Sequence, residues 1–65
     1  MSKMKELKER AEHYAEEHKK AFESWTHGEI VDAWLHEGNE KVVCIRYEDG
    51  RYWHYEETQG GLKWW

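Results

Sequence analysis

The spacing of the apolar residues in this 65-residue chain changes near Gly28. Before that glycine they recur every three or four residues, which is the period of one face of an α-helix. After it, β-branched and aromatic residues become dense and alternate with polar ones, as in a strand. The pattern predicts an α+β fold in which a long N-terminal amphipathic helix packs on a three- to four-stranded antiparallel β-meander.

The predicted helix covers about residues 3–25, because Ser2 is a suitable N-cap and Gly28 stands where a C-terminal stop is expected. The sheet covers about residues 29–65. Its last segment, from Leu62 to Trp65, is expected to be a short fourth strand or a docked tail. The first three strands are predicted at about 29–36, 41–48 and 51–57.

Two turn signals set the expected register of the sheet. Asp49-Gly50 predicts a two-residue hairpin loop of type I′, and Gly38-Asn39 is the corresponding signal for the first hairpin. Phe22 is expected to pack on the sheet face under the helix, together with Leu35 and Trp53. The full predicted inner face is Val31, Ala33, Leu35, Val42, Cys44, Arg46, Trp53 and Tyr55.

The other face of the predicted sheet has a surplus of large apolar and aromatic residues, and one helix can cover only one side. Exposed apolar patches of this kind are typical of interfaces. The alternative is that the tail folds Trp64 and Trp65 over this face and closes a small barrel-like core. The predicted binding surface consists of Trp34, Tyr47 and Tyr52, with Asp32 and His54 as polar selectors.

The length, the net charge and the number of cysteines limit the kinds of protein that this chain can be. A chain of 65 residues is expected to form one domain, residues 1–65, with a core stabilised by its ten aromatic residues. The formal charge is −4, and residues 28–65 carry four Lys/Arg against eight Asp/Glu, which disfavours a phosphate-binding surface. The single cysteine, Cys44, suits a reducing compartment. Since no apolar run is long enough for a signal peptide or a membrane span, we expect a cytoplasmic protein.

The pattern of chemical groups does not favour catalysis, and we expect no enzyme, cofactor or metal site. On the predicted register, His36 and His54 lie on the second face and are separated by the middle strand, while Cys44 lies on the inner face without a neighbouring base. A core of this size is also expected to lack an enzyme-sized pocket of about 300 Å³ or more.

Three functions remain open at this point. The first is a protein-binding module, an adaptor or stoichiometric inhibitor whose aromatic, acidic-rimmed sheet face binds a partner with a basic surface, such as a nucleic-acid-handling protein. The second is single-stranded nucleic-acid binding by base stacking, and the third is a structural homodimer. The order of elements is of a type found among small accessory proteins of phages and mobile elements. The carboxylates expected to attract a basic partner are Asp32, Glu40, Glu56 and Glu57.

Overall fold

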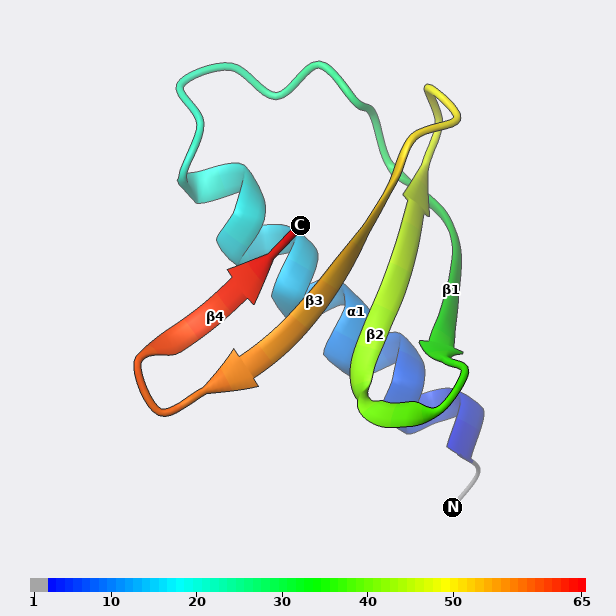
Figure 1. The fold of residues 1–65 in the computed structure, drawn as a ribbon. Coiled ribbons are helices and arrows are strands. Elements are labelled where there is room, and N and C mark those ends of the chain that lie inside the picture. The colour runs from blue at the N-terminus through cyan, green and yellow to red at the C-terminus, as the bar shows by residue number, and fades with distance from the viewer. Residues whose placement is uncertain (1–2) are drawn as a thin grey trace.

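The computed structural model describes residues 3–65, with side chains from residue 5 onward. Four strands form one antiparallel sheet in the order β1-β2-β3-β4, and α1 crosses one face of it (Figure 1). The predicted α+β fold is confirmed, and of the two alternatives for the last segment the structure has the fourth strand. The elements are α1 Lys3–Lys20, β1 Ile30–His36, β2 Asn39–Tyr47, β3 Tyr52–Thr58 and β4 Gly61–Trp64. No helix in the described part of the chain has the length and apolar character needed to span a membrane.

Helix α1 ends at Lys20, earlier than predicted. The amide of Ala21 donates to the carbonyl of His18 at 3.1 Å, a short-range bond that closes the last turn. Trp25, which was expected inside the helix, lies in the connection to β1, and its indole Nε1 donates to the carbonyl of Gly28 at 2.8 Å. The Trp25 ring packs 5.0 Å from the Tyr47 ring. Tertiary packing of Trp25 therefore overrides the helical spacing that extended the prediction.

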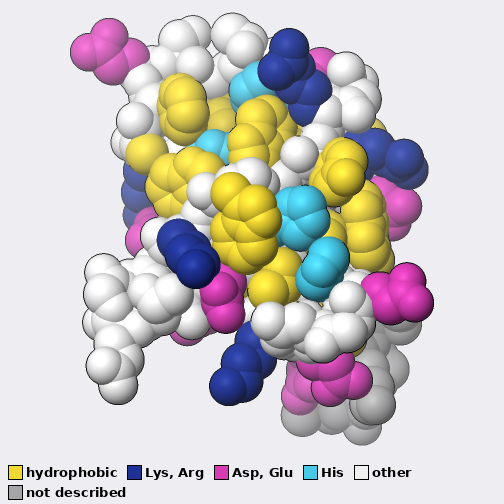
Figure 2. Space-filling model, in the orientation of Figure 1, with side chains coloured by type: hydrophobic (Ala, Val, Ile, Leu, Met, Phe, Trp, Pro, Cys, Tyr) yellow, Lys and Arg dark blue, Asp and Glu magenta, His cyan; other side chains and the backbone are white. Residues whose placement is uncertain are grey.

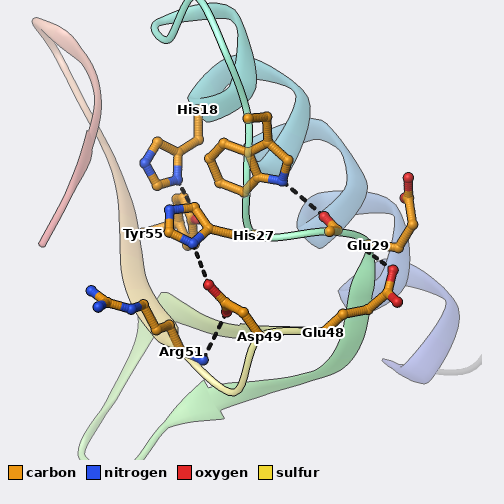
Figure 3. Close-up of polar contacts among 9 residues, drawn as sticks. His18, His27, Glu29, Glu48, Asp49, Arg51 and Tyr55 are labelled. Atoms are coloured by element: carbon orange, nitrogen blue, oxygen red, sulfur yellow. Dashed lines mark hydrogen bonds and ion pairs between the residues drawn. The ribbon is translucent and has the colours of Figure 1, made fainter.

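The β2–β3 hairpin has a three-residue loop, so the predicted two-residue type I′ turn is wrong. The amide of Tyr47 donates to the carbonyl of Arg51, and the amide of Gly50 donates to the carbonyl of Tyr47, both at 2.9 Å. A type I′ turn needs φ > 0 at both central residues, but in this loop only Gly50 has a positive φ, +87°. The Asp49 carboxylate accepts hydrogen bonds from the Arg51 amide at 3.0 Å and from His27 at 2.5 Å (Figure 3).

The extra loop residue shifts the pairing of β2 by one position and turns every one of its side chains to the opposite face. Ile45 pairs with Ala33 on one side and with Trp53 on the other. A further irregularity between Ile30 and Asp32 in β1 lets Ile30 pack against the core, while Val31 is exposed. The predicted inner positions Val31, Val42, Cys44 and Arg46 are therefore wrong. Their places under the helix are taken by Ile30, Val43, Ile45 and Tyr47.

The core lies between α1 and the sheet, and its composition differs from the prediction. Phe22 is 48% exposed and Leu35 is 37% exposed, so the expected core group of these two residues with Trp53 does not form. Phe22 lies beyond the end of the helix and cannot continue its buried stripe. The small side chains on α1 bring the helix close to tyrosine rings that fill the space. The buried core cluster is Ala11, Tyr14, Ala15, Val43, Ile45, Tyr47 and Tyr55.

A polar chain runs through this core. The Nδ1 atom of His18 lies 2.6 Å from the Tyr55 hydroxyl, which lies 2.6 Å from the Tyr47 hydroxyl. Figure 3 shows the His18–Tyr55 contact. The Tyr14 hydroxyl donates to the Glu57 carboxylate at 2.7 Å at the edge of the same layer. These bonds satisfy hydroxyl groups that would otherwise destabilise an apolar interior.

Strand β4 divides the two C-terminal tryptophans between the faces of the sheet. Trp64 lies on the helix side, with its ring 4.5 Å from that of His18. Trp65 lies on the other side, where its ring is stacked on His54. The alternative in which both tryptophans cover the second face is therefore wrong.

Candidate functional site

The side of the sheet that faces away from α1 is called the outer face below. Figure 2, in the orientation of Figure 1, shows hydrophobic and histidine side chains gathered over this face, with charged groups mostly toward its edges. The strand pairing and side-chain contacts place eleven residues on the outer face. They are Asp32, Trp34, His36, Val42, Cys44, Arg46, Tyr52, His54, Glu56, Lys63 and Trp65.

Four of the five predicted binding residues lie on the outer face: Trp34, Tyr52, Asp32 and His54. The prediction for Tyr47 is wrong, because its side chain is fully buried under the helix and bonded to Tyr55. The cause is the three-residue loop that follows Tyr47. The four residues that lie on the outer face belong to β1 and β3, whose faces do not depend on the register of β2.

The aromatic groups of the outer face form a continuous row. The Trp34 and Tyr52 ring centroids are 5.7 Å apart, and those of Tyr52 and His54 are 5.6 Å apart. The row continues to Trp65, whose ring is parallel to that of His54 within 7° at 5.2 Å. Tyr52 is 54% exposed and Trp65 is 53% exposed, so the row presents large rings to solvent.

The predicted binding surface does not include Trp65, although the position of this residue follows from antiparallel pairing. The backbones of His54 and Trp65 exchange hydrogen bonds of 3.0 and 3.1 Å, which puts the two residues directly opposite each other. The sequence Thr58-Gln59-Gly60-Gly61 indicates a turn before the C-terminal segment. Extending its pairing by a few residues places Trp65 on the face that carries His54.

The charges of the outer face are paired within the face. Arg46 lies 3.3 Å from the Asp32 carboxylate, and Lys63 lies 3.3 Å from that of Glu56. The expected acidic rim is therefore balanced by cations at these two positions. The other two carboxylates of that prediction lie toward the helix: Glu57 bonds to Tyr14, and Glu40 lines a small hollow with Leu7 and Arg10.

Cys44 lies between His36 and His54, contrary to the expectation that its side chain is on the opposite face of the sheet from both histidines. Its Sγ atom is 4.0 Å from Nδ1 of His36. The donor atoms of His36, Cys44 and His54 lie within 4.8 Å of one another. Cys44 is buried, and this burial raises the pKa of its thiol, whereas reactive cysteines have lowered pKa values. The raised pKa argues against Cys44 as a nucleophile, and the grouping of three donor atoms, not the pKa, is the feature that points to metal coordination.

A groove of about 860 Å³ lies between α1 and the edge strand β1. The expectation that so small a chain lacks a hollow of this size is wrong. Apolar side chains such as Leu7 and Ile30 line it, with lysines and glutamates around them, and the described lining residues include no histidine, cysteine or serine. The groove therefore lacks the nucleophile and imidazole groups common in hydrolytic sites.

The outer face combines exposed rings, paired charges and a buried thiol flanked by imidazoles. Such a surface can bind by ring stacking, by hydrogen bonding at its edges and by donor atoms at its centre. Comparison of the chain with protein families, with curated proteins and with solved structures finds no match.

Proposed function

We propose that this chain is a small non-enzymatic protein-binding module, an adaptor or stoichiometric inhibitor, that uses its outer face. The observation that carries the proposal is the row of Trp34, Tyr52, His54 and Trp65, whose rings contact one another on a face that no described element covers. Tyrosine and tryptophan are enriched among the residues that contribute most to protein–protein affinity.

These rings are not needed to complete the core. The helix side of the sheet is already closed by side chains with no exposure, including Val43, Ile45 and Tyr55. Tyr52, by contrast, leaves about half of its surface in solvent. Each aromatic side chain has few rotatable bonds, so it can bury a large area at a small cost in conformational entropy. Burial of these rings against a partner would therefore stabilise the complex, while the isolated fold gains little from them.

The charge pattern favours a protein partner over a nucleic acid. Arg46 and Lys63 are neutralised by carboxylates on the same face. Phosphate binding needs free cations, and a contact surface with balanced charge does not provide them. The formal charge of −4 over the whole chain would instead attract a basic protein from a distance, and arginine side chains of that partner could lie over the rings.

Site-specific photo-crosslinking in cells of the natural source tests this proposal. A photoreactive residue at Tyr52 is expected to capture one other protein, whereas the same residue at Glu9, exposed on α1, should not capture it. Capture of a second copy of the chain would identify a homodimer instead. Capture of a nucleic acid would identify the stacking function, and either result would reject the proposal.

Binding of the captured protein to purified variants then tests the role of the rings. Tyr52→Ala and Trp65→Ala should each weaken binding by about 2 kcal/mol or more, which is roughly 30-fold in Kd. Phe22→Ala is the matched control, because Phe22 is similarly exposed, 48%, but is not on the outer face. Equal losses for all three variants would show that the outer face is not the binding surface.

A further inference from the structure

Three possible metal ligands of the outer face come from three neighbouring strands. His36 ends β1, Cys44 lies within β2 and His54 lies within β3. Hydrogen bonding between these strands fixes the spacing of the three backbones. The distance between Cys44 Sγ and His36 Nδ1 is 4.0 Å, and the three donor atoms lie within 4.8 Å of one another.

This spacing is close to that of a filled zinc site. Zinc binds imidazole nitrogen at about 2.0–2.1 Å and thiolate sulfur at about 2.3 Å, so two donors on one tetrahedral ion are separated by about 3.5 Å. The three donors need to approach one another by roughly 1 Å, which side-chain rotation supplies without a change in the sheet.

The surroundings of His54 resemble those of a metal-binding histidine. Its Nδ1 atom lies 3.4 Å from the carbonyl oxygen of Trp65, and its ring is stacked on the Trp65 indole. The His36 ring lies in an edge-to-face arrangement with the same imidazole at a centroid distance of 5.1 Å. Histidines that bind metals commonly donate one ring N–H to a backbone carbonyl, which leaves the other nitrogen for the ion. This arrangement leaves Nε2 of His54 available.

We propose that His36, Cys44 and His54 bind one zinc ion, with a fourth coordination position open to water or to a ligand from outside the chain. Two imidazoles and one thiolate form a donor set that suits zinc, and an open position is usual where three protein groups bind it. Binding replaces the S–H bond of Cys44 with an S–Zn bond and releases one proton to solvent. The proposal rests on these three ligands and not on the partner proposed above.

Metal titration of the purified chain tests the site directly. The chain is prepared without an affinity tag, reduced and free of metal, and Co²⁺ is added as a spectroscopic probe. One equivalent is expected to bind and to produce a thiolate-to-cobalt charge-transfer absorption, which Zn²⁺ then removes by displacement. Zinc should also raise the Tm, because a ligand that binds the folded state stabilises it.

Variants identify the ligands. His36→Ala and His54→Ala should each weaken zinc binding at least about 10-fold, and Cys44→Ser should remove the charge-transfer absorption. His13→Ala, which replaces an exposed histidine of α1, is the control and should bind like the parent chain. If Cys44→Ser does not fold, the spectrum of the parent chain and the His36→Ala variant still decide the result.

Two outcomes would overturn the proposal. One is a parent chain that shows no charge-transfer absorption at saturating Co²⁺. The other is zinc binding that His36→Ala and His54→Ala leave unchanged, or that His13→Ala weakens equally. Since these measurements use the isolated chain, they are independent of whether Tyr52 and Trp65 bind a protein.

Discussion

The Nδ1 atom of His18 lies 2.6 Å from the hydroxyl oxygen of Tyr55, and both side chains are fully buried. The other ring nitrogen of His18, Nε2, has no hydrogen-bond partner among the described residues. Burial lowers the pKa of His18 from 6.5 to about 4, and the charge of His27 has a smaller effect in the same direction. The rings packed around the imidazole are Phe22, Trp25, Trp53, Tyr55 and Trp64.

The free energy of unfolding should therefore fall as the pH is lowered from 6.5 to about 4. In this window the unfolded chain binds a proton at His18 that the folded chain excludes, so stability rises with pH. The full loss is about 3 kcal/mol, because each unit of pKa difference corresponds to about 1.4 kcal/mol. Urea denaturation across the window measures it. In the His18→Leu variant the free energy of unfolding should depend less on pH. An unchanged pH dependence in that variant would assign the acid sensitivity to other groups. His13→Leu is the control.

The observed register predicts opposite effects for two adjacent residues of β2. Ile45 is fully buried under α1, so Ile45→Ala should lower the free energy of unfolding by about 2–5 kcal/mol. Arg46 is on the outer face in an exposed ion pair with Asp32, so Arg46→Ala should cost less than about 1 kcal/mol. Chemical denaturation of both variants decides the register. A larger loss for Arg46→Ala would favour the register predicted from the turn signals.

Two glycines with positive φ differ in the space around them, and their alanine variants should differ in stability. At Gly50, φ +87°, an added Cβ meets nothing within 4 Å, so Gly50→Ala should cost only the backbone strain of about 1–2 kcal/mol. At Gly28, φ +81°, the same atom would lie 2.8 Å from Cβ of Glu48. The Glu48 carboxylate accepts a hydrogen bond from the Glu29 amide at 2.7 Å, and its displacement would break this bond (Figure 3). In thermal unfolding, the Tm of Gly28→Ala should be well below that of Gly50→Ala. Equal Tm values would contradict the close contact with Glu48.

The types of the elements could be predicted because burial follows a local period in the sequence. Ala11, Tyr14 and Ala15 recur at helical spacing and are all buried in the structure. The register of β2 could not be predicted in the same way, because Asp49-Gly50 fits a two-residue loop and also a three-residue loop in which only Gly50 has a positive φ. A difference of one residue in this loop decides which side of β2 is buried.

In the candidate site too, features that follow the local sequence period could be predicted, and features that depend on strand register could not. The positions of Trp34, Tyr52 and His54 on the outer face could be predicted because their strands alternate in the expected phase. The approach of Cys44 to the two histidines was not predicted, since it requires the correct phase of β2. The position of Trp65 opposite His54 was not predicted either, since it requires the pairing of the C-terminal segment with β3. Both depend on contacts between segments that are separated along the chain.

The outer face contains the aromatic part of a single-strand-binding surface without its cationic part. Bases stack readily on tryptophan and tyrosine rings, but affinity also needs cations that contact the phosphates. Arg46 and Lys63 each lie 3.3 Å from a carboxylate of the same face. We therefore expect the parent chain to give no band shift with single-stranded DNA or RNA, even at low salt.

Removing the carboxylate charges of Asp32 and Glu56 should give the outer face a measurable affinity for single-stranded nucleic acid. The double variant Asp32→Asn, Glu56→Gln leaves the rings in place and frees both cations, so weak binding to single strands is expected. Contact with two phosphates corresponds to a slope of about −1.4 for log K against log salt, since each contact on a single strand contributes about −0.7. Glu9→Gln with Glu12→Gln changes the net charge equally on α1 and is the control. Binding by the parent chain would contradict the proposed protein-binding function, whereas binding by the double variant alone would show that Asp32 and Glu56 exclude nucleic acids from the face.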